Sequence, residues 1–337
     1  MLDPSGSNNF VVPIIGLLNM PIPKGPHLEF EQPVVELAMK IEDLLKTGGI
    51  TGSDVKELQS KKEALQHKNA TKLTAWNRVE LARRAGRPYT LDYVQNIFQD
   101  FVELHGDRCF GDDPALVAGL ARLDGHSVVL VGQQKGRDTK ESIRRNFGMA
   151  HPEGYRKALR VMKMAEKFRL PVIAFIDTPG AYPGVGAEER GQAEAIARNL
   201  MEMAVLETPI VAVVIGEGAS GGALGIGVGD RILMLENSWF GVISPESCSA
   251  ILWGDGSKKQ DLSGTMRITA SDLKDLKVVD RIVPEPLGGA HWEPEATYRF
   301  LKTALIEELD TLRLMDVRTL IEKRIAKYAS MAQFTGK

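Results

Sequence analysis

The sequence predicts an α/β protein with a largely parallel core sheet, and three features carry this prediction. Apolar segments 171–176 and 210–215 have the composition of buried strands, and each runs into a glycine-rich turn and a helix start. Predicted helices alternate with these and the other predicted strands along the chain, and such alternation is typical of α/β folds. The segments 117–123 and 127–133, joined at Asp124-Gly125, predict a β-hairpin.

The flanking regions are predicted to be helical. Residues 29–100 read as a helical region, with one helix from Pro33 to before Gly48, a charged helix capped by Ser53, and a third over about 71–84. Residues 101–290 hold the α/β core. Residues 291–337 contain two polar helices, about 293–310 and 316–329, which are expected to pack on the core or on a partner. Residues 1–28 read as a tail, disordered or placed upstream of a natural start at Met20.

Within the core, the remaining elements follow the same alternation. Helices are expected over 154–168 and 187–206, a short helix from Gly221, and a strand over 231–235. Further short elements are expected to run as far as Val283.

The composition places the 337-residue chain among globular proteins. It is 43% hydrophobic and 26% charged with a net charge of −2, so the overall charge gives no reason to expect nucleic acid. Two cysteines, Cys109 and Cys248, exclude a disulfide framework and a four-Cys zinc site within the chain. Low cysteine use fits a reducing cytoplasm. No apolar run reaches the roughly 18 residues of a membrane helix.

One local charge imbalance stands out. Between Lys135 and Arg169 the chain has eleven Lys and Arg against four Asp and Glu. This stretch is either a solvated face whose charges are paired within helices, or a docking surface for an acidic protein or a phosphate-bearing ligand.

The glycine-rich turn after the second apolar strand, Gly216–Gly222, resembles a dinucleotide-binding site and also a site with a nucleophilic serine. The turn after the first strand is Thr178–Gly184. Gly216-x-Gly218-x-x-Gly221, with Glu236 twenty residues on, matches the spacing of a dinucleotide-binding fingerprint. Ten glycine-rich residues before the next strand speak against it, because a dinucleotide-binding helix is longer and glycine weakens helices. Ser220 at the helix start is either a capping residue or a nucleophile, and a nucleophile would need a histidine base.

Two further motifs have better structural explanations. Asp177-Thr-Pro-Gly180 resembles the phosphate-sensing segment of GTPases, but the chain has no Gly-x-x-x-x-Gly-Lys-[Ser/Thr] loop upstream. Val161-Met-Lys-Met164 resembles a biotinylated tetrapeptide, but it lies within a predicted helix with an apolar face. Core methionines explain it better.

The glycine turns themselves predict anion binding. Backbone N–H groups at a helix start carry partial positive charge, and glycine leaves them accessible to an approaching oxygen. Close packing of a helix on a strand also selects glycine. For Gly221 and Gly222 together, paired with the Pro-Gly-Ala turn after the neighbouring strand, we favour stabilisation of an enolate or similar anion. The sequence shows no obvious acid–base pair, so the proton is expected to move between substrate atoms.

Seven segments are similar to those of a known family. They are Arg87–Tyr93, Phe147–Met149, Pro152–Ala158, Asp177–Gln192, Gly216–Leu224, Val242–Glu246 and Pro284–His291. Together they resemble the α-subunit family of the multi-subunit acetyl-CoA carboxylase carboxyltransferases of bacteria and plastids. The similarity runs from about Phe30 to the C-terminus.

This resemblance implies a crotonase-like spiral of ββα units and the transfer of a carboxyl group from carboxybiotin to acetyl-CoA, giving malonyl-CoA for fatty acid biosynthesis. It implies three partners: a β subunit that completes an α2β2 complex, a biotin carboxyl carrier protein that presents the carboxybiotin, and acetyl-CoA. The β subunit would carry a zinc ribbon and most of the acetyl-CoA site, so this chain itself is expected to hold no metal. The cell compartment would be the cytoplasm, or the stroma for a plastid protein.

The resemblance also assigns roles to the glycine turns. The backbone N–H groups of Gly221, Gly222, Gly180 and Ala181 would form an oxyanion hole for the biotin ureido oxygen. The freed biotin nitrogen would take the acetyl proton. The lining of the carboxybiotin site would come from five neighbours, Tyr182, Pro183, Gly184, Gly218 and Ser220.

Rival hypotheses remain at this stage. A carboxyltransferase for another acyl-CoA, or a stand-alone crotonase-like acyl-CoA enzyme, would share the turns, but the second would be active without a partner. A non-catalytic scaffold would dock the carrier protein through residues 135–169 and would bind it in a salt-sensitive way.

Overall fold

The computed structural model describes residues 22–23, 25–47 and 52–331. Most of the tail expected at the N-terminus therefore lies outside the described residues. Within them, one sheet has the order β1-β2-β3-β4-β5-β6-β8, and β7 pairs with the far end of β5. The strands are β1 (Gln99–Glu103), β2 (Leu116–Leu123), β3 (His126–Gln133), β4 (Val172–Thr178), β5 (Ile210–Ala219), β6 (Arg231–Leu235), β7 (Trp239–Gly241) and β8 (Arg281–Val283).

The first three strands of the sheet pair antiparallel, and the remaining strands pair parallel. β1, β2 and β3 pair antiparallel, and Leu123 faces His126 across the predicted hairpin turn. From β3 through β4, β5 and β6 to β8, each pair is parallel. The α/β prediction and the hairpin are thus confirmed. Because the parallel strands point the same way, the turns that leave β4 and β5 lie at one edge of the sheet.

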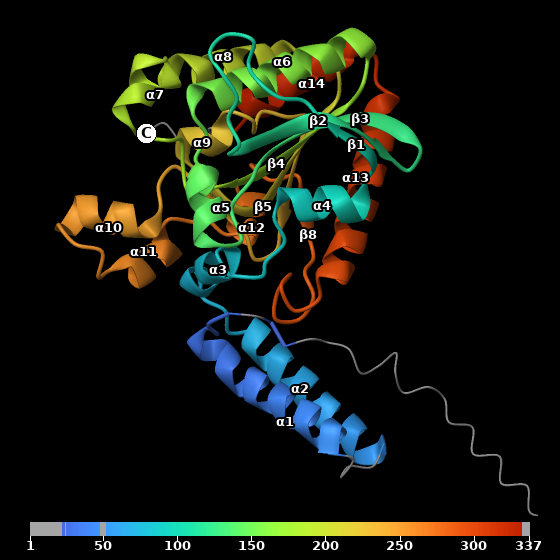
Figure 1. Ribbon diagram of the computed structural model, residues 1–337, viewed down its shortest axis with the longest axis vertical. Helices are drawn as coiled ribbons and strands as arrows, with labels where there is room; N and C mark the ends of the chain where they lie inside the picture. The colour runs from blue at the N-terminus through green and yellow to red at the C-terminus, as the bar shows by residue number, and fades with distance from the viewer. Residues whose placement is uncertain (1–21, 24, 48–51, 332–337) are drawn as a thin grey trace, which may run out of the picture.

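Helices cover both faces of the sheet (Figure 1). One face packs against α6 (Pro152–Phe168), α8 (Gln192–Val205) and α9 (Ser220–Leu224). The other packs against α4 (Thr90–Ile97) and α13 (Pro294–Arg313). Along β4, Ala174 and Ile176 join the first apolar cluster, and Ile173 and Phe175 join the second. Burial on both sides is typical of parallel strands and fixes their positions tightly.

Two core predictions need correction. The strand expected to stop at residue 215 continues to Ala219, because β7 pairs with Glu217, Gly218 and Ala219 and β4 pairs with Gly218. The helix expected over 187–206 is two helices, α7 (Val185–Glu189) and α8. Gly191 separates them at a φ of 82°, in the left-handed region that favours glycine.

The first two helices form a hairpin that extends away from the sheet (Figure 1). They are α1 (Gln32–Thr47) and α2 (Gly52–Ala70), which begins one residue before the predicted cap. Val34, Val35 and Ala38 of α1 pack with Trp292 of the core. The third helix, α3 (Ala75–Ala82), is shorter than predicted and is capped by Thr74, whose hydroxyl accepts a hydrogen bond from the Asn77 N–H.

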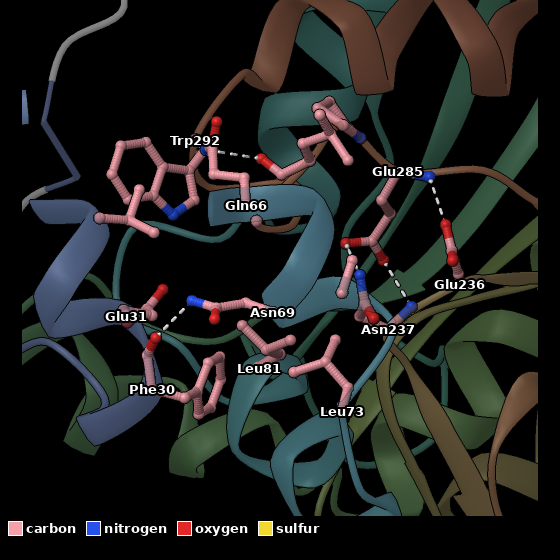
Figure 2. Close-up of a pocket in the computed structure, with 15 residues that line it drawn as sticks. Phe30, Glu31, Gln66, Asn69, Leu73, Leu81, Glu236, Asn237, Glu285 and Trp292 are labelled. Carbon is pink, nitrogen blue, oxygen red and sulfur yellow. Dashed lines mark hydrogen bonds between the residues drawn. The ribbon is translucent and has the colours of Figure 1, made fainter. Parts of the chain in front are cut away.

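A small cavity of about 70 Å³ lies between this hairpin and the core (Figure 2). Glu31 at its wall binds Arg84 at 3.0 Å and His291 at 2.6 Å. Burial by itself would raise the pKa of Glu31, but His291, the Leu28 N–H and Arg84 lower it to about 2. Glu31 is therefore ionised, and a neutral His291 donates its Nε2–H to it.

Shorter helices complete the described chain. They are α5 (Thr139–Arg144), α10 (Pro245–Trp253), α11 (Lys259–Thr265) and α12 (Ala270–Asp275). α10 and α11 pack on each other and project from the body of the protein (Figure 1). The exposed side chains of Ile251, Leu252 and Trp253 lie on α10.

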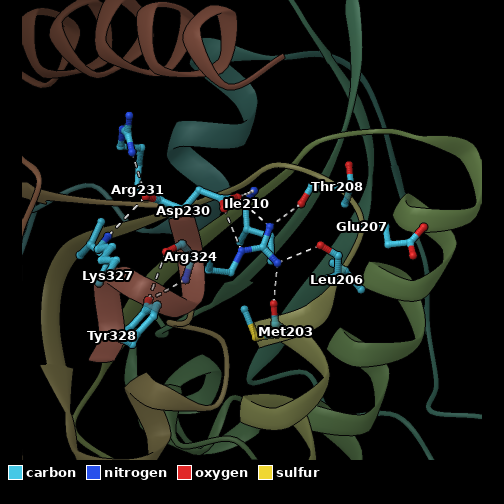
Figure 3. A network of polar contacts seen from close by, with 12 residues as sticks. Met203, Leu206, Glu207, Thr208, Ile210, Asp230, Arg231, Arg324, Lys327 and Tyr328 are labelled. Carbon is cyan, nitrogen blue, oxygen red and sulfur yellow. Dashed lines mark hydrogen bonds and ion pairs between the residues drawn. The ribbon is translucent and has the colours of Figure 1, made fainter. Parts of the chain in front are cut away.

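The last helix, α14 (Val317–Ala329), is fastened to the sheet by one arginine (Figure 3). Arg324 is 1% exposed and bonds both carboxylate oxygens of Asp230, at 2.8 Å each. Its remaining donors reach the carbonyl oxygens of Met203, Leu206 and Thr208. These contacts join α14 to the end of α8 and to the starts of β5 and β6.

Candidate functional site

The two glycine turns predicted from the sequence are in direct contact. A Cβ added to Gly222 would lie 2.4 Å from the carbonyl carbon of Gly180 and 2.6 Å from the Ala181 nitrogen. No larger residue fits at position 222 without moving the Gly180–Ala181 peptide. The turn after β4 and the start of α9 therefore meet at one point, as the sequence predicted for turns on neighbouring parallel strands.

The bases of the two turns are tied together by buried charges. Lys135, just after β3, contacts Asp177 at 2.7 Å and Glu217 at 2.8 Å. The Asp177 carboxylate also accepts the Glu217 N–H at 3.0 Å. Gly216 is required here, because a Cβ would come within 2.5 Å of the Asp177 Oδ1. The ends of β4 and β5, at Asp177 and Glu217, are thus held against one another.

This charge cluster continues toward α10. Arg83, at the end of α3, binds Glu217 and Glu246 at 2.5 Å each. Burial would raise the pKa of Glu217, but Lys135 and Arg83 lower it overall. Burial would lower the pKa of Lys135, and its two carboxylate partners raise it instead. Both groups are therefore charged at neutral pH. Burial raises the pKa of Asp177, with Lys135 opposing it.

A second link was not predicted from the sequence. Gln133 is fully buried at the end of β3, and its Oε1 accepts the Asp177 N–H at 3.0 Å. Its Nε2 donates to the Gly222 carbonyl oxygen at 2.8 Å. Tyr155 of α6 contacts the same oxygen at 3.5 Å. Gln133 and Lys135 carry no recognisable motif, so nothing in the local sequence marks them.

The two turns differ in which of their backbone N–H groups already donate a hydrogen bond within the chain. The Gly180 N–H donates to the Thr178 hydroxyl at 3.1 Å, so its part is to shape the turn. The Ala181 N–H has no acceptor among the described residues. Gly221 and Gly222 lie in the first turn of α9, where N–H groups have no partner within the helix, and no side chain caps this helix.

Ser220 joins β5 to α9 through an unusual backbone conformation. Its φ is 57°, in the left-handed region that costs energy for residues other than glycine. The strand thereby passes directly into the helix, and α9 begins at Ser220 itself. The serine side chain is exposed.

The predicted lining residues divide into two groups. Tyr182 stacks on His151 with ring centroids 4.2 Å apart, Pro183 is exposed, and Gly184 caps α7 beside the Tyr182 ring. These three surround the first turn. Gly218 is buried within β5, where a Cβ would meet the Phe240 ring at 2.7 Å. Its role is to let β7 approach, so it is not available to line a ligand site.

The alternative motifs find no support in the structure. Gly216 and Gly218 lie inside β5 and α9 has five residues, whereas a dinucleotide fingerprint needs glycines in the turn and a longer helix. Ser220 has no histidine within hydrogen-bond distance among the described residues. Lys163 lies on α6 and pairs with Glu202 at 2.9 Å, and Met162 beside it is fully buried.

The basic stretch 135–169 is largely neutralised within the protein. Arg160 donates to the carbonyl oxygens of Gly106 and His105. Six others pair with carboxylates: Lys135, Arg137, Arg145, Arg156, Lys157 and Lys163. This pattern favours a face whose charges are paired over a dedicated docking surface.

Other features of the described chain lie outside the turns. The cavity beneath the α1–α2 hairpin is lined by no residue of either turn. No helix in the described part of the chain combines the length and apolarity that crossing a membrane requires. In residues 22–23, 25–47 and 52–331, acidic, histidine and cysteine side chains form no group of three or more that could hold a metal ion.

Comparison with known proteins decides the family. A profile of the acetyl co-enzyme A carboxylase carboxyltransferase-like family matches residues 27–332. The chain belongs to this family. The resemblance inferred from the seven motifs is therefore confirmed, and membership places the chain among the carboxyltransferases, as the sequence predicted.

Curated relatives support this assignment over nearly their whole length. A protein of Geobacter metallireducens named acetyl-coenzyme A carboxylase carboxyl transferase subunit alpha is 56% identical over 310 residues, which cover 91% of this chain and 98% of that protein. A protein of the same name from Thermus thermophilus is 52% identical, with the same shares covered.

Solved structures confirm the predicted crotonase-like fold. Transcarboxylase 12S, with methylmalonyl-coenzyme A bound, has a TM-score of 0.54 at 21% identity over 69% of this chain. This chain spans 45% of that longer chain. A Pseudomonas malonate decarboxylase hetero-tetramer in complex with coenzyme A has a TM-score of 0.54 at 18% identity, over 66% of this chain and 89% of that one. At these identities the likeness concerns the fold.

Proposed function

We propose that this chain is the α subunit of an acetyl-CoA carboxylase carboxyltransferase and provides the biotin side of the active site. The reaction moves a carboxyl group from carboxybiotin, presented by a carrier protein, to acetyl-CoA, giving malonyl-CoA. The observation that carries this proposal is the contact between Gly222 and the Gly180–Ala181 peptide in a chain of this family. It brings the N–H groups of two turns to one place.

The residues present fit a biotin ureido group. A Cβ on Gly180 would meet no atom within 4 Å, so open space borders the turn, while Gly222 closes it from the other side. The donors that we assign to the ureido oxygen are the N–H groups of Ala181, Gly221 and Gly222. Carboxybiotin supplies the carboxyl group when it is bound. Tyr182, Pro183 and Ser220 would border it, with Gly184 shaping the turn.

The chemistry of this chain is then electrostatic. When carboxybiotin is bound, N–H dipoles fixed at these positions would stabilise the negative charge that develops on the ureido oxygen during the transfer. One such donor is worth roughly 100- to 1,000-fold in rate. Because the glycines are held by packing, the donors need little reorganisation during the reaction. No side chain of this chain is assigned as a general base.

The remaining parts of the active site are assigned to partners. We propose that a β subunit binds acetyl-CoA and carries the zinc site, that the two chains assemble as α2β2, and that a biotin carboxyl carrier protein delivers the substrate in the cytoplasm. The curated relatives are named as alpha subunits, and the Pseudomonas structure is a hetero-tetramer, both of which support a multi-subunit enzyme.

One reconstitution tests the proposal. The full chain is co-expressed with the carboxyltransferase β subunit of its own source, purified as a complex, and assayed for decarboxylation of malonyl-CoA in the presence of biocytin. We expect activity from the complex and none from either chain by itself. Activity of this chain without a partner, or an inactive α2β2 complex, would contradict the proposal.

A further inference from the structure

We propose that Gln133 is a positioning residue for the carboxyl transfer reaction, because its side-chain amide fixes the two glycine turns relative to one another. This inference rests on the proposed function, since it concerns the same backbone donors. The amide spans from the N–H of Asp177, at the base of the first turn, to the carbonyl oxygen of Gly222, inside the second.

The position of Gln133 is itself fixed from three sides. Its backbone pairs with Leu116 of β2, and its carbonyl oxygen accepts the Thr90 hydroxyl of α4 at 2.5 Å. The side chain is fully buried and uses both polar atoms at 3.0 Å or less. A bridge anchored in this way transmits the geometry of the sheet to the turns.

The bridge needs one acceptor and one donor at the same time. A primary amide supplies both without carrying charge, which suits a fully buried site. A carboxylate at this position accepts from Asp177 but cannot donate to Gly222, and a thioether accepts only weakly and cannot donate. The Gly222 carbonyl belongs to the residue whose Cα lies against the Gly180–Ala181 peptide. Losing the donor leaves this oxygen with only the longer contact to Tyr155, at 3.5 Å, and so loosens the contact that sets the spacing of the turns.

Two substitutions separate positioning from a structural role. In Gln133→Met the side-chain length is kept and both hydrogen bonds are lost, so we expect kcat to fall roughly 10- to 100-fold, as for misplacement of a reacting group by about 1 Å. The KM for malonyl-CoA should change less than about twofold, because that substrate is assigned to the β subunit. A purely structural residue would lower stability and leave kcat of the assembled complex unchanged.

Gln133→Glu adds a pH readout. The ionised side chain lacks the donor, whereas the protonated side chain restores an O–H that can reach the Gly222 oxygen. Burial raises the pKa of such a carboxyl above its ordinary value of about 4.3, so its protonated fraction grows as the pH falls. We expect the kcat of Gln133→Glu relative to wild type to rise at least about fivefold between about pH 8.5 and about pH 6.

The other charged groups around the site are present in both the wild type and Gln133→Glu. The effect of their own titration on kcat therefore cancels in the ratio of the two kcat values. Among the described residues, five titratable or charged groups pack around the site. They are Asp177 of β4, Glu217 of β5, Tyr155 of α6, Lys135 after β3 and Arg87 after α3.

Gln134→Glu is the matched control. Gln134 is 4% exposed, but its amide contacts the Leu91 N–H and the Lys135 carbonyl and reaches neither turn. Its kcat ratio should not depend on pH.

The experiment uses the α2β2 complex and assays malonyl-CoA decarboxylation with biocytin. A flat pH ratio for Gln133→Glu, or a Gln133→Met complex with kcat within about threefold of wild type, would overturn the inference. If either variant does not assemble, amide hydrogen exchange on the full chain decides: the inference requires faster exchange confined to segments 178–184 and 216–224. An inactive wild-type complex would instead refute the proposed function.

Discussion

The two edges of the parallel sheet bury charges in different ways. At the edge where β5 and β6 begin, Arg324 uses all five of its N–H donors on Asp230 and three carbonyl oxygens. At the edge where β4 and β5 end, Lys135 pairs with both Asp177 and Glu217, and Arg83 supplies a second positive charge to Glu217. There the buried charges lie at the base of the glycine turns, and the Ala181 N–H has no acceptor among the described residues.

The glycine edge differs from the Arg324 edge in its free backbone donors and not in its buried charges. Buried ion pairs occur at both edges, so burial of charge does not mark the site. What distinguishes the glycine edge is a set of backbone donors held rigidly by packing and by side chains that satisfy other groups. The same comparison predicts that changes at the Arg324 edge act on stability, whereas changes at the glycine edge act on the rate.

The largest expected effect is on stability at the Arg324 edge. Arg324→Met leaves the buried Asp230 carboxylate with the Ile210 N–H as its one hydrogen-bond partner among the described residues, so the free energy of unfolding should fall by about 3–5 kcal/mol. Urea denaturation of the full chain measures this. Because α14 contacts neither turn, kcat of the assembled complex should stay within about twofold of wild type. A large loss of kcat without a loss of stability would remove the distinction between the edges.

The next effect is on the rate at the glycine edge. In Gly222→Ala the new methyl group overlaps the Gly180–Ala181 peptide and forces the turns apart. We expect kcat for malonyl-CoA decarboxylation to fall by roughly 100-fold or more while the α2β2 complex still assembles. Size-exclusion chromatography checks assembly. Turnover near that of wild type in an intact complex would show that the turns need not touch.

A smaller, pH-dependent effect is expected where the α1–α2 hairpin meets the core. Glu31 has a pKa of about 2 in the folded chain, below its ordinary value, so the stability that it contributes is complete above about pH 4.5 and is lost as the pH falls toward 2. Glu31→Gln should cost about 1–3 kcal/mol at pH 7. Its stability should decline less steeply than that of wild type below about pH 4.5. Parallel pH profiles from urea denaturation would contradict this.

The smallest effect provides the control for glycine replacement. Gly264 lies in α11, and a Cβ there would meet nothing within 4 Å. Gly264→Ala should raise the free energy of unfolding by up to about 1 kcal/mol, because alanine is the better helix former, and should leave kcat unchanged. A rate loss comparable to that of Gly222→Ala would mean that glycine replacement acts by a general mechanism and not at the turns.

The sequence predicted the elements of the site better than the bonds that hold them. Two apolar strands followed by glycines were sufficient to place both turns at one edge, and the contact at Gly222 confirms that they meet. The continuation of β5 to Ala219 was missed, because glycine and glutamate are atypical of strands and the extension depends on pairing with β4 and β7. At these residues, pairing with the neighbouring strands outweighs the low strand preference of glycine and glutamate.

The residues that the sequence did not reveal bond to partners that lie far away in the sequence. Gln133 lies 44 residues from Asp177 and 89 from Gly222, and Arg324 lies 94 residues from Asp230. A single sequence has no periodicity or motif that links positions so far apart, so these bonds become visible only in the folded chain. Family motifs located the turns, but they did not indicate which donors are already used, as at Gly180.

If the two turns act together on the ureido oxygen of biotin, replacing that oxygen should matter less once the turns are forced apart. A double cycle measures this: biocytin and its analogue with sulfur in place of the ureido oxygen are compared in the wild-type and Gly222→Ala complexes. Sulfur accepts hydrogen bonds weakly, so the analogue should slow malonyl-CoA decarboxylation by wild type at least about tenfold more than it slows Gly222→Ala. An equal slowing in both complexes would contradict the account.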